Sequence, residues 1–275
     1  MDTAPKLVVS DIDGTLLNSQ DRIIPRLRDV LGRAIRSGTE IALATGRPHR
    51  WIYPVLEQLP IRPVCVTANG AVLYDSATDR VLRAHELAPA TMNDVVAAAR
   101  EALAEHGGVS IACERAGLSA FEPEEEMFVI APGYLHTWAE QGFGVLPEEE
   151  VIAEPAVKLI LRNDRLSAPQ MYRLIAPHVD APKAHVPFSM NAGLLEVAAP
   201  GVTKALGVST LAQLHGIDRA EIVTFGDMPN DIEMLEWAGL GVAMGNAREE
   251  VKAAADLVTD SNDDGGVARV LERWF

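Results

Sequence analysis

The sequence predicts an α/β fold, a doubly wound, Rossmann-like parallel sheet interrupted by an inserted α+β cap domain. Near both ends of the chain, short apolar segments alternate with helical segments, which is typical of parallel strands joined by right-handed crossovers. Several apolar segments end abruptly in Asp, Thr or Gly, as buried strands do when they run into loops. The middle of the chain has strands with few helical crossovers, which indicates an α+β insert.

The N-terminal part has the pattern β-α-β-α-β. In the first helical segment apolar residues recur at helical spacing, Pro25 stands at its start and Gly38 follows its end, so we expect a helix of about three turns. The strands are expected at 7–9, 40–45 and 64–67, and the second helix is expected to open at 46–48.

The insert and the C-terminal part follow in order. In the insert we expect helices at 91–105 and near 169–175, strands near 109–113 and 157–161, and strands 184–190 and 194–197 joined by a hairpin-like turn at 191–193. After it come helices at 204–215, from Asn230 and at 267–274, and strands at 221–225, 241–244 and 256–259. The predicted catalytic core is therefore residues 1–83 and 199–275, and the predicted cap is 84–198.

Composition excludes some partners. The chain of 275 residues has 24 Lys and Arg against 39 Asp and Glu, and a net charge of −15 would repel a nucleic acid backbone. No run approaches the roughly 20 apolar residues of a membrane span. Cys65 and Cys113 lie in apolar stretches, where buried, reduced thiols are expected. We expect a cytoplasmic monomer or homodimer whose partner is a small molecule.

Two acidic clusters follow predicted strands. Asp11 and Asp13 precede Gly14, a pattern that also occurs in turns and calcium loops, and Asp227 and Asp231 open a helix, where Asp is also a common N-cap. Because strand C-termini border the ligand crevice of a doubly wound sheet, two strands can bring all four carboxylates together. Such crowding requires a cation, and Mg²⁺ suits few carboxylates combined with water and phosphate.

Candidate phosphate-binding groups accompany these clusters. Thr45, Gly46 and Arg47 follow a strand and offer a hydroxyl, main-chain amides and a guanidinium, and Lys204 adds a point charge. Hydrolysis of a phosphate monoester needs a nucleophile, an acid, a metal and positive anchors, and all four appear at the ends of predicted core strands or the starts of predicted core helices.

Four ordered motifs resemble those of the haloacid dehalogenase-like hydrolases, and the Cof-type subgroup, with a large cap between the second and third motifs, is most similar. The motifs are 11–17 (DIDGTLL), 44–47 (ATGR), 201–204 (GVTK) and 226–231 (GDMPND). Further matches are 68–71 (ANGA), 243–247 (AMGNA) and 261–268 (SNDDGGVA). One departure is Ala205, where the family commonly has glycine.

The resemblance implies a phosphatase that forms an aspartyl-phosphate. Asp11 would be the nucleophile, and Asp13 the acid toward the leaving group and the base toward water. Asp13 would then have to be protonated at neutral pH, which burial or neighbouring carboxylates would favour. Thr45 and Lys204 would anchor the phosphate.

Metal and substrate contacts are implied in the same way. Magnesium would rest on Asp11, the main-chain carbonyl of Asp13 and Asp227, with Asp231 assisting. Gly46, Arg47 and Asn230 are further candidates for substrate binding.

The sequence is also compatible with two other functions, because an aspartyl-phosphate can pass to an alcohol, as in a phosphotransferase or mutase, and a phosphate-binding sensor needs no catalysis. A sugar phosphate is the expected substrate. In the cap, Lys158 and Arg162 flank an apolar strand, either as the solvated ends of an edge strand or as substrate contacts.

Overall fold

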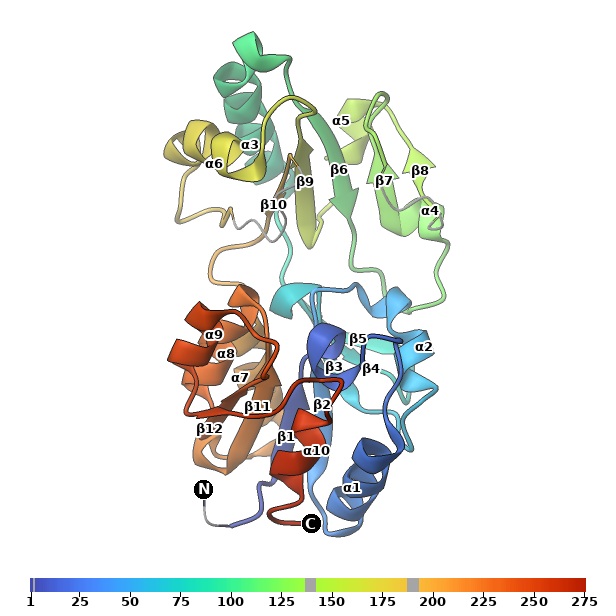
Figure 1. The fold of residues 1–275 in the computed structure, drawn as a ribbon. Coiled ribbons are helices and arrows are strands. Elements are labelled where there is room, and N and C mark those ends of the chain that lie inside the picture. The colour runs from blue at the N-terminus through green and yellow to red at the C-terminus, as the bar shows by residue number, and fades with distance from the viewer. Residues whose placement is uncertain (2, 137–141, 187–192) are drawn as a thin grey trace. The chain divides into compact units, whose positions relative to one another are not determined.

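The computed structural model describes residues 1, 3–136, 142–186 and 193–275 (Figure 1). The chain divides into two compact units: Met1–Arg83 together with Thr203–Phe275, and Ala84–Val202.

The first unit contains an eight-stranded sheet in the order β13-β12-β11-β1-β2-β3-β4-β5. Its parallel strands are β1 (Leu7–Ser10), β2 (Glu40–Ala44), β3 (Val64–Thr67), β11 (Ile222–Gly226), β12 (Leu240–Ala243) and β13 (Leu257–Val258). The predicted α/β class with a doubly wound parallel core is confirmed. The sequence did not predict the last two strands, β4 (Val72–Asp75), which is antiparallel to β3, and β5 (Arg80–Ala84) beside it.

The helices of the first unit pack on this sheet. They are α1 (Pro25–Arg36), α2 (Tyr53–Leu56), α7 (Lys204–His215), α8 (Ile232–Trp237), α9 (Glu249–Ala254) and α10 (Gly266–Leu271). As predicted, α1 begins at Pro25 and ends before Gly38, and its apolar face is buried. Val208 and Leu211 of α7 share an apolar cluster with Leu7 and Val9 of β1, so α7 is fixed against the strands that lead to the candidate site.

The helical stretch expected after 46–48 is present but short. Pro48 is extended and stands at the N-cap of a 3₁₀ turn, His49–Trp51, which leads into the single turn of α2. A proline disfavours the helical conformation in the residue before it, so Arg47 cannot begin a helix. The segment that follows Thr45 is consequently a loop.

The second unit contains a five-stranded sheet in the order β10-β9-β6-β7-β8, with helices against one face. Its strands are β6 (Ser110–Glu114), β7 (Phe128–Ile130), β8 (Gly144–Val145), β9 (Lys158–Arg162) and β10 (Leu194–Val197), and its helices are α3 (Pro89–Ala102), α4 (Glu124–Met127), α5 (Glu148–Val151) and α6 (Ala168–Ile175). Met92 of α3 and Met171 of α6 are fully buried in one cluster with Leu161 of β9. This is an α+β unit, because all its strand pairs except β7–β8 are antiparallel.

The interpretation of β9 as an edge strand is wrong, because β9 lies between β10 and β6. Lys158 is accordingly only 13% exposed and forms an ion pair of 2.6 Å with Glu196. Arg162 is 14% exposed and pairs with Asp164 at 3.0 Å. Neither cation is a solvated edge group.

Part of the predicted hairpin lies outside the described residues, which omit 187–192. On either side of that range, His185 forms an isolated antiparallel bridge with Ala198, and β10 occupies the second predicted strand. Cys65 and Cys113 are buried free thiols, as expected. In the described part of the chain, we find no helix with both the length and the apolar character that crossing a membrane requires.

Candidate active site

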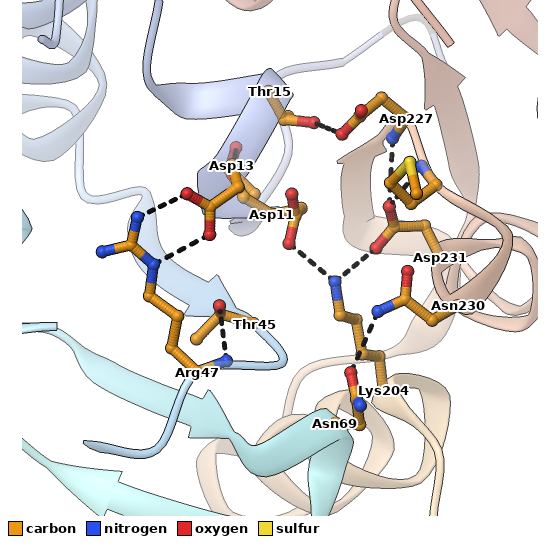
Figure 2. Close-up of polar contacts among 12 residues, drawn as sticks. Asp11, Asp13, Thr15, Thr45, Arg47, Asn69, Lys204, Asp227, Asn230 and Asp231 are labelled. Carbon is orange, nitrogen blue, oxygen red and sulfur yellow. Dashed lines mark hydrogen bonds and ion pairs between the residues drawn. The ribbon is translucent and has the colours of Figure 1, made fainter. Parts of the chain in front are cut away.

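Three neighbouring parallel strands end at one edge of the first sheet, and each is followed by a candidate residue. Ser10 of β1 is in register with Leu43 of β2 and with Phe225 of β11, so the three strands end at nearly the same level. Asp11 follows β1, Thr45 follows β2 and Asp227 follows β11. Parallel pairing therefore brings together residues that lie far apart in the sequence, as Figure 2 shows.

Lys204 lies at the centre of the buried acidic groups. It is the first residue of α7, whose N-cap Thr203 accepts a hydrogen bond from the Leu206 amide. Its Nζ lies 2.6 Å from Asp11 Oδ1 and 2.6 Å from Asp231 Oδ1, and its side chain is only 2% exposed. One ammonium thus holds two carboxylates, and its place is set by the start of a packed helix.

Asp231 and Asp227 are braced by the loop that carries them. Asp231 Oδ2 accepts hydrogen bonds from the amides of Asp227 and Met228, at 3.0 and 2.9 Å. Thr15 Oγ1 donates to Asp227 Oδ1 at 2.8 Å. Asp231 therefore caps the 3₁₀ turn Pro229–Asp231 that leads into α8, as the N-cap interpretation expected, while its other oxygen, Oδ1, accepts from Lys204.

Asp13 and Arg47 form a pair that the sequence did not predict. The Arg47 guanidinium donates two hydrogen bonds to the Asp13 carboxylate, that from Nε to Oδ2 measuring 2.8 Å. The pKa of Arg47 is raised, chiefly because of these hydrogen bonds. Asp13 is 54% exposed, so burial, one of the two causes considered for its protonation, does not apply, and Arg47 is engaged with a carboxylate.

Gly14 explains how Asp13 turns away from the buried cluster. Its φ is +75°, which glycine adopts without strain, and a Cβ at this position would lie 2.5 Å from Asp227 Oδ2. The chain therefore reverses immediately after Asp13 while Asp227 approaches the backbone closely.

The loop 45–47 is more fully bonded than its sequence suggests. Thr45 is 1% exposed, its amide donates to the Val66 carbonyl, and its hydroxyl oxygen accepts a hydrogen bond of 3.1 Å from the Arg47 amide. Of the three amides in this loop, only that of Gly46 has no acceptor among the described residues. The donors that remain for an anion are this amide and the Thr45 hydroxyl.

Asn230 and two residues that the sequence did not assign complete the site. Asn230 Nδ2 donates to Asn69 Oδ1 at 2.9 Å, and Thr15 holds Asp227 as described above. Asn69 and Thr15 both lie in segments matched to family motifs, so the signal was present. Their roles depend on contacts between segments about 160 to 210 residues apart, and the spacing of motifs along the sequence does not predict such contacts.

A family model described as haloacid dehalogenase-like hydrolase matches residues 8–271. The chain belongs to this family. The resemblance to the Cof-type haloacid dehalogenase-like hydrolases is thereby confirmed over almost the whole chain.

Several relatives of this hydrolase have known names. The 5-amino-6-(5-phospho-D-ribitylamino)uracil phosphatase YitU of Bacillus subtilis (strain 168) is 28% identical over 275 residues, covering 100% of this chain and 99% of the relative. The pyridoxal phosphate phosphatase YbhA of Escherichia coli (strain K12) is 26% identical over 278 residues, covering 97% of each. The solved structure of BT4131, a sugar phosphatase of subclass IIB of the family, superposes with a TM-score of 0.77 at 25% identity, covering 97% of this chain and 98% of that one.

Electrostatics of the buried cluster favour a cation. Burial, together with Asp231 and Asp227, raises the pKa of Asp11 to about 8 despite the opposing effect of Lys204. Burial likewise raises the pKa of Asp227 to about 6. Burial alone would lower the pKa of Lys204, but Asp11 and Asp231 outweigh it and raise that pKa. One ammonium does not fully compensate the buried carboxylates of this hydrolase.

The oxygen atoms of the cluster fit a divalent metal ion. Asp11, Asp227 and Asp231 each offer a carboxylate oxygen within 4.8 Å of the others. Within the described ranges, Asp11 Oδ2 and Asp227 Oδ2 accept no hydrogen bond, whereas both oxygens of Asp231 are engaged. Asp11 and Asp227 are thus the better direct ligands, and Asp231 acts mainly by holding Lys204 and the loop.

Proposed function

We propose that this phosphatase hydrolyses a small organic phosphate monoester in two steps, with Asp11 as the nucleophile. The carrying observation is the position of Asp11: it is buried at the end of β1 and held by Lys204, and the carboxylate of Asp13, two residues further on, is half exposed. A nucleophile needs fixed geometry, while a proton-transfer group must reach both the leaving group and water.

An oxygen of Asp11 forms a bond to phosphorus as the ester oxygen leaves, and the leaving oxygen takes a proton from Asp13. Because both Asp13 oxygens accept from the Arg47 guanidinium in this structure, Asp13 carries that proton only on an oxygen that Arg47 has released. Asp13 then takes a proton from water, the water oxygen bonds to phosphorus, and Asp11 is released as a carboxylate with orthophosphate as the product. Lys204 orients Asp11, and the Thr45 hydroxyl and the Gly46 amide are the donors proposed to bind the phosphate oxygens.

Arg47 is assigned a different role from the phosphate binding first expected of it. Because its guanidinium already makes two hydrogen bonds to Asp13, we infer that Arg47 fixes both oxygens of that carboxylate. A phosphate contact by Arg47 would have to compete with this bond.

Magnesium is the proposed metal, held by Asp11 and Asp227 and, as the family resemblance implies, by the main-chain carbonyl of Asp13. When bound, it would neutralise the crowded carboxylates and the charge of the phosphate oxygens. We expect excess chelator to abolish phosphate release and Mg²⁺ to restore it better than Ca²⁺, whose larger and looser shell suits in-line transfer poorly. Full activity in excess chelator would refute a metal role.

The substrate class rests on the relatives. A uracil derivative with a phosphorylated ribityl chain, pyridoxal phosphate and sugar phosphates are substrates named for proteins similar to this chain. All are small monoesters, and these compounds form the panel to be tested first.

Replacement of Asp11 tests the nucleophile. Asp11→Asn keeps the shape but should lower kcat by at least about a thousandfold, or about 4 kcal/mol of barrier, measured as orthophosphate released from the panel. Asp29→Asn, on the exposed face of α1, is the matched control and should retain wild-type rates. Wild-type turnover by purified Asp11→Asn would sink the assignment, and loss of free phosphate on adding an acceptor alcohol would instead indicate a phosphotransferase.

The second unit is proposed to select the substrate, because every candidate chemical group described above lies in the first unit. Lys158 is the residue to test, since its low exposure and its partner Glu196 make it a fixed charge. If its side chain faces the substrate, Lys158→Ala should change the relative kcat/KM across the panel by about tenfold or more, as should Arg162→Ala on the same condition, whereas Lys183→Ala, at a side chain 56% exposed, should not. An unchanged order of preference in Lys158→Ala would remove Lys158 as a specificity residue.

A further inference from the structure

The turn at Ala68–Gly70, directly after β3, has an unusual backbone. Its three residues have positive φ values of +50°, +56° and +97°. The left-handed conformation is disfavoured for Ala and less so for Asn, and only glycine adopts it freely. A run of three such residues persists only where the surroundings impose it, and strained backbone of this kind is concentrated at functional sites.

Main-chain hydrogen bonds tie this turn to the loop 45–47. The Ala68 amide donates to the Arg47 carbonyl at 2.9 Å, and the Asn69 amide donates to the Thr45 carbonyl at 3.0 Å. The left-handed turn is what points two successive amides at one neighbouring loop. The position of the loop that carries the proposed phosphate donors therefore depends on the conformation of the turn.

The same turn lies against the start of the helix that carries Lys204. A Cβ on Gly70 would lie 1.9 Å from the Thr203 carbonyl oxygen, so the two backbones are in direct contact. A Cβ on Gly207, one turn into α7, would lie 3.1 Å from the Cα of Gly70. No side chain fits between them, which fixes the distance between the turn and Lys204.

The Asn69 side chain adds the third connection. Its Oδ1 accepts a hydrogen bond of 2.9 Å from Asn230 Nδ2, and a Cβ on Gly46 would lie 3.0 Å from the same oxygen. Figure 2 shows the Asn69 carboxamide facing that of Asn230. Together with Gly70, which lies against Thr203, Asn69 thus joins the loop after β2, the start of α7 and the loop after β11.

We propose that the Ala68–Gly70 turn is a positioning element of the active site and that the Asn69 carboxamide is the group that sets the Thr45 and Gly46 donors relative to Lys204. This inference rests on the proposed phosphatase site but not on its chemistry, because Asn69 acts through the residues it holds. The turn supplies geometry, and misplacing phosphate donors by a fraction of an ångström lowers turnover more than it lowers stability.

Two substitutions at left-handed positions separate an effect on the site from the general loss of a hydrogen-bonded side chain. Asn69→Gly removes the carboxamide and keeps the left-handed backbone without strain, and Asp79→Gly, at a φ of +51° between β4 and β5, likewise removes a side chain that accepts a hydrogen bond, in this case from Tyr74. We expect Asn69→Gly to lower kcat/KM by about tenfold or more while its melting temperature stays within a few degrees of wild type. Asp79→Gly should keep kcat/KM within about twofold of wild type.

Asn230 tests whether the hydrogen bond carries the effect. If it does, Asn69→Gly combined with Asn230→Ala should be no slower than the slower single variant, because both remove one interaction. If the loss of kcat/KM in the double variant equalled the product of the losses in the two single variants, the role of this hydrogen bond would be overturned.

A readout that does not depend on turnover keeps the inference separate from the proposed function. Amide hydrogen exchange over 44–47 and 203–206 should be faster in Asn69→Gly than in wild type and unchanged in Asp79→Gly. Unchanged exchange in Asn69→Gly would overturn the positioning role whatever the activity, and so would an equal loss of kcat/KM in both variants. If the wild-type protein released no phosphate but exchange were still faster in Asn69→Gly, the positioning role of the turn would be supported and the proposed phosphate hydrolysis rejected.

Discussion

Replacing Lys204 by Met tests how strongly the buried cluster depends on one charge. Met retains a long apolar side chain, so the packing of the Lys204 stem is largely kept while the ammonium and its hydrogen bonds are lost. Asp11 and Asp231, each 2.6 Å from Nζ in the native protein, are then left without their cation.

The expected loss of stability can be worked from these distances. Asp11 and Asp231 oxygens lie within 4.8 Å of each other, and two unit charges at that separation would repel by about 3.5 kcal/mol at an effective dielectric constant of about 20. Protonation of Asp11, whose pKa burial already raises to about 8, relieves part of this repulsion. Breaking a buried ion pair by removing one partner costs about 3–5 kcal/mol, so Lys204→Met should lower the free energy of unfolding by about that amount.

Two other lysines provide matched controls at graded burial. Lys158 pairs with Glu196 at the same 2.6 Å but is 13% exposed, and Lys6 pairs with Glu221 at 2.8 Å and is 62% exposed. Lys158→Met should cost about 1–3 kcal/mol and Lys6→Met less than about 1 kcal/mol, because solvent screens the exposed pair.

Urea unfolding in the presence of chelator measures all three variants without compensation by a metal ion. The urea concentration at the unfolding midpoint should be lowest for Lys204→Met, higher for Lys158→Met and highest for Lys6→Met. The slope of the unfolding free energy against urea concentration should be the same in all three variants. Equal destabilisation by Lys204→Met and Lys6→Met would refute the reasoning, because it would mean that the crowded carboxylates are not compensated by Lys204.

Three further outcomes are expected. Burial raises the pKa of Cys65 and Cys113, that of Cys113 to about 12. A thiol reagent at pH 8 should therefore label neither cysteine in the native protein and both in urea, and fast labelling of the native protein would contradict this. Asn246→Ala removes a hydrogen bond of 2.9 Å to the Gly14 carbonyl, next to Asp13, and should lower kcat by about tenfold. KM should stay unchanged. Arg47→Lys cannot donate two parallel hydrogen bonds to Asp13 and should lower kcat by a similar factor of about ten; an unchanged kcat would exclude the positioning role of Arg47.

Much of the first unit could be predicted because its signals are local. Pro25 and Gly38 mark the ends of α1, and the apolar runs that end in polar loops mark the parallel strands. Their neighbours in the sheet follow from the rules for crossovers, so the meeting of Asp11 and Asp227 at one edge was also predictable.

The parts that could not be predicted depend on longer-range geometry. The antiparallel strands β4 and β5 have no crossover helix to reveal them. The pairing of Arg47 with Asp13 depends on how two loops face each other, and the burial of Lys158 depends on β9 being central in its sheet. Spacing in a single sequence does not specify such contacts.

Like charges at the candidate site push apart the loops that carry them, so uncharged groups must hold these loops in place. Asn246 Nδ2 donates to the Gly14 carbonyl, Asn262 Nδ2 donates to the Leu17 carbonyl, and the Asn262 amide donates to Asn246 Oδ1. These two asparagines come from the motifs at 243–247 and 261–268, and they hold the segment after Asp11 much as Asn69 holds the loop after β2. The family motifs in this chain therefore comprise two kinds of residue, those proposed to react and those that keep the reacting residues together against their own repulsion.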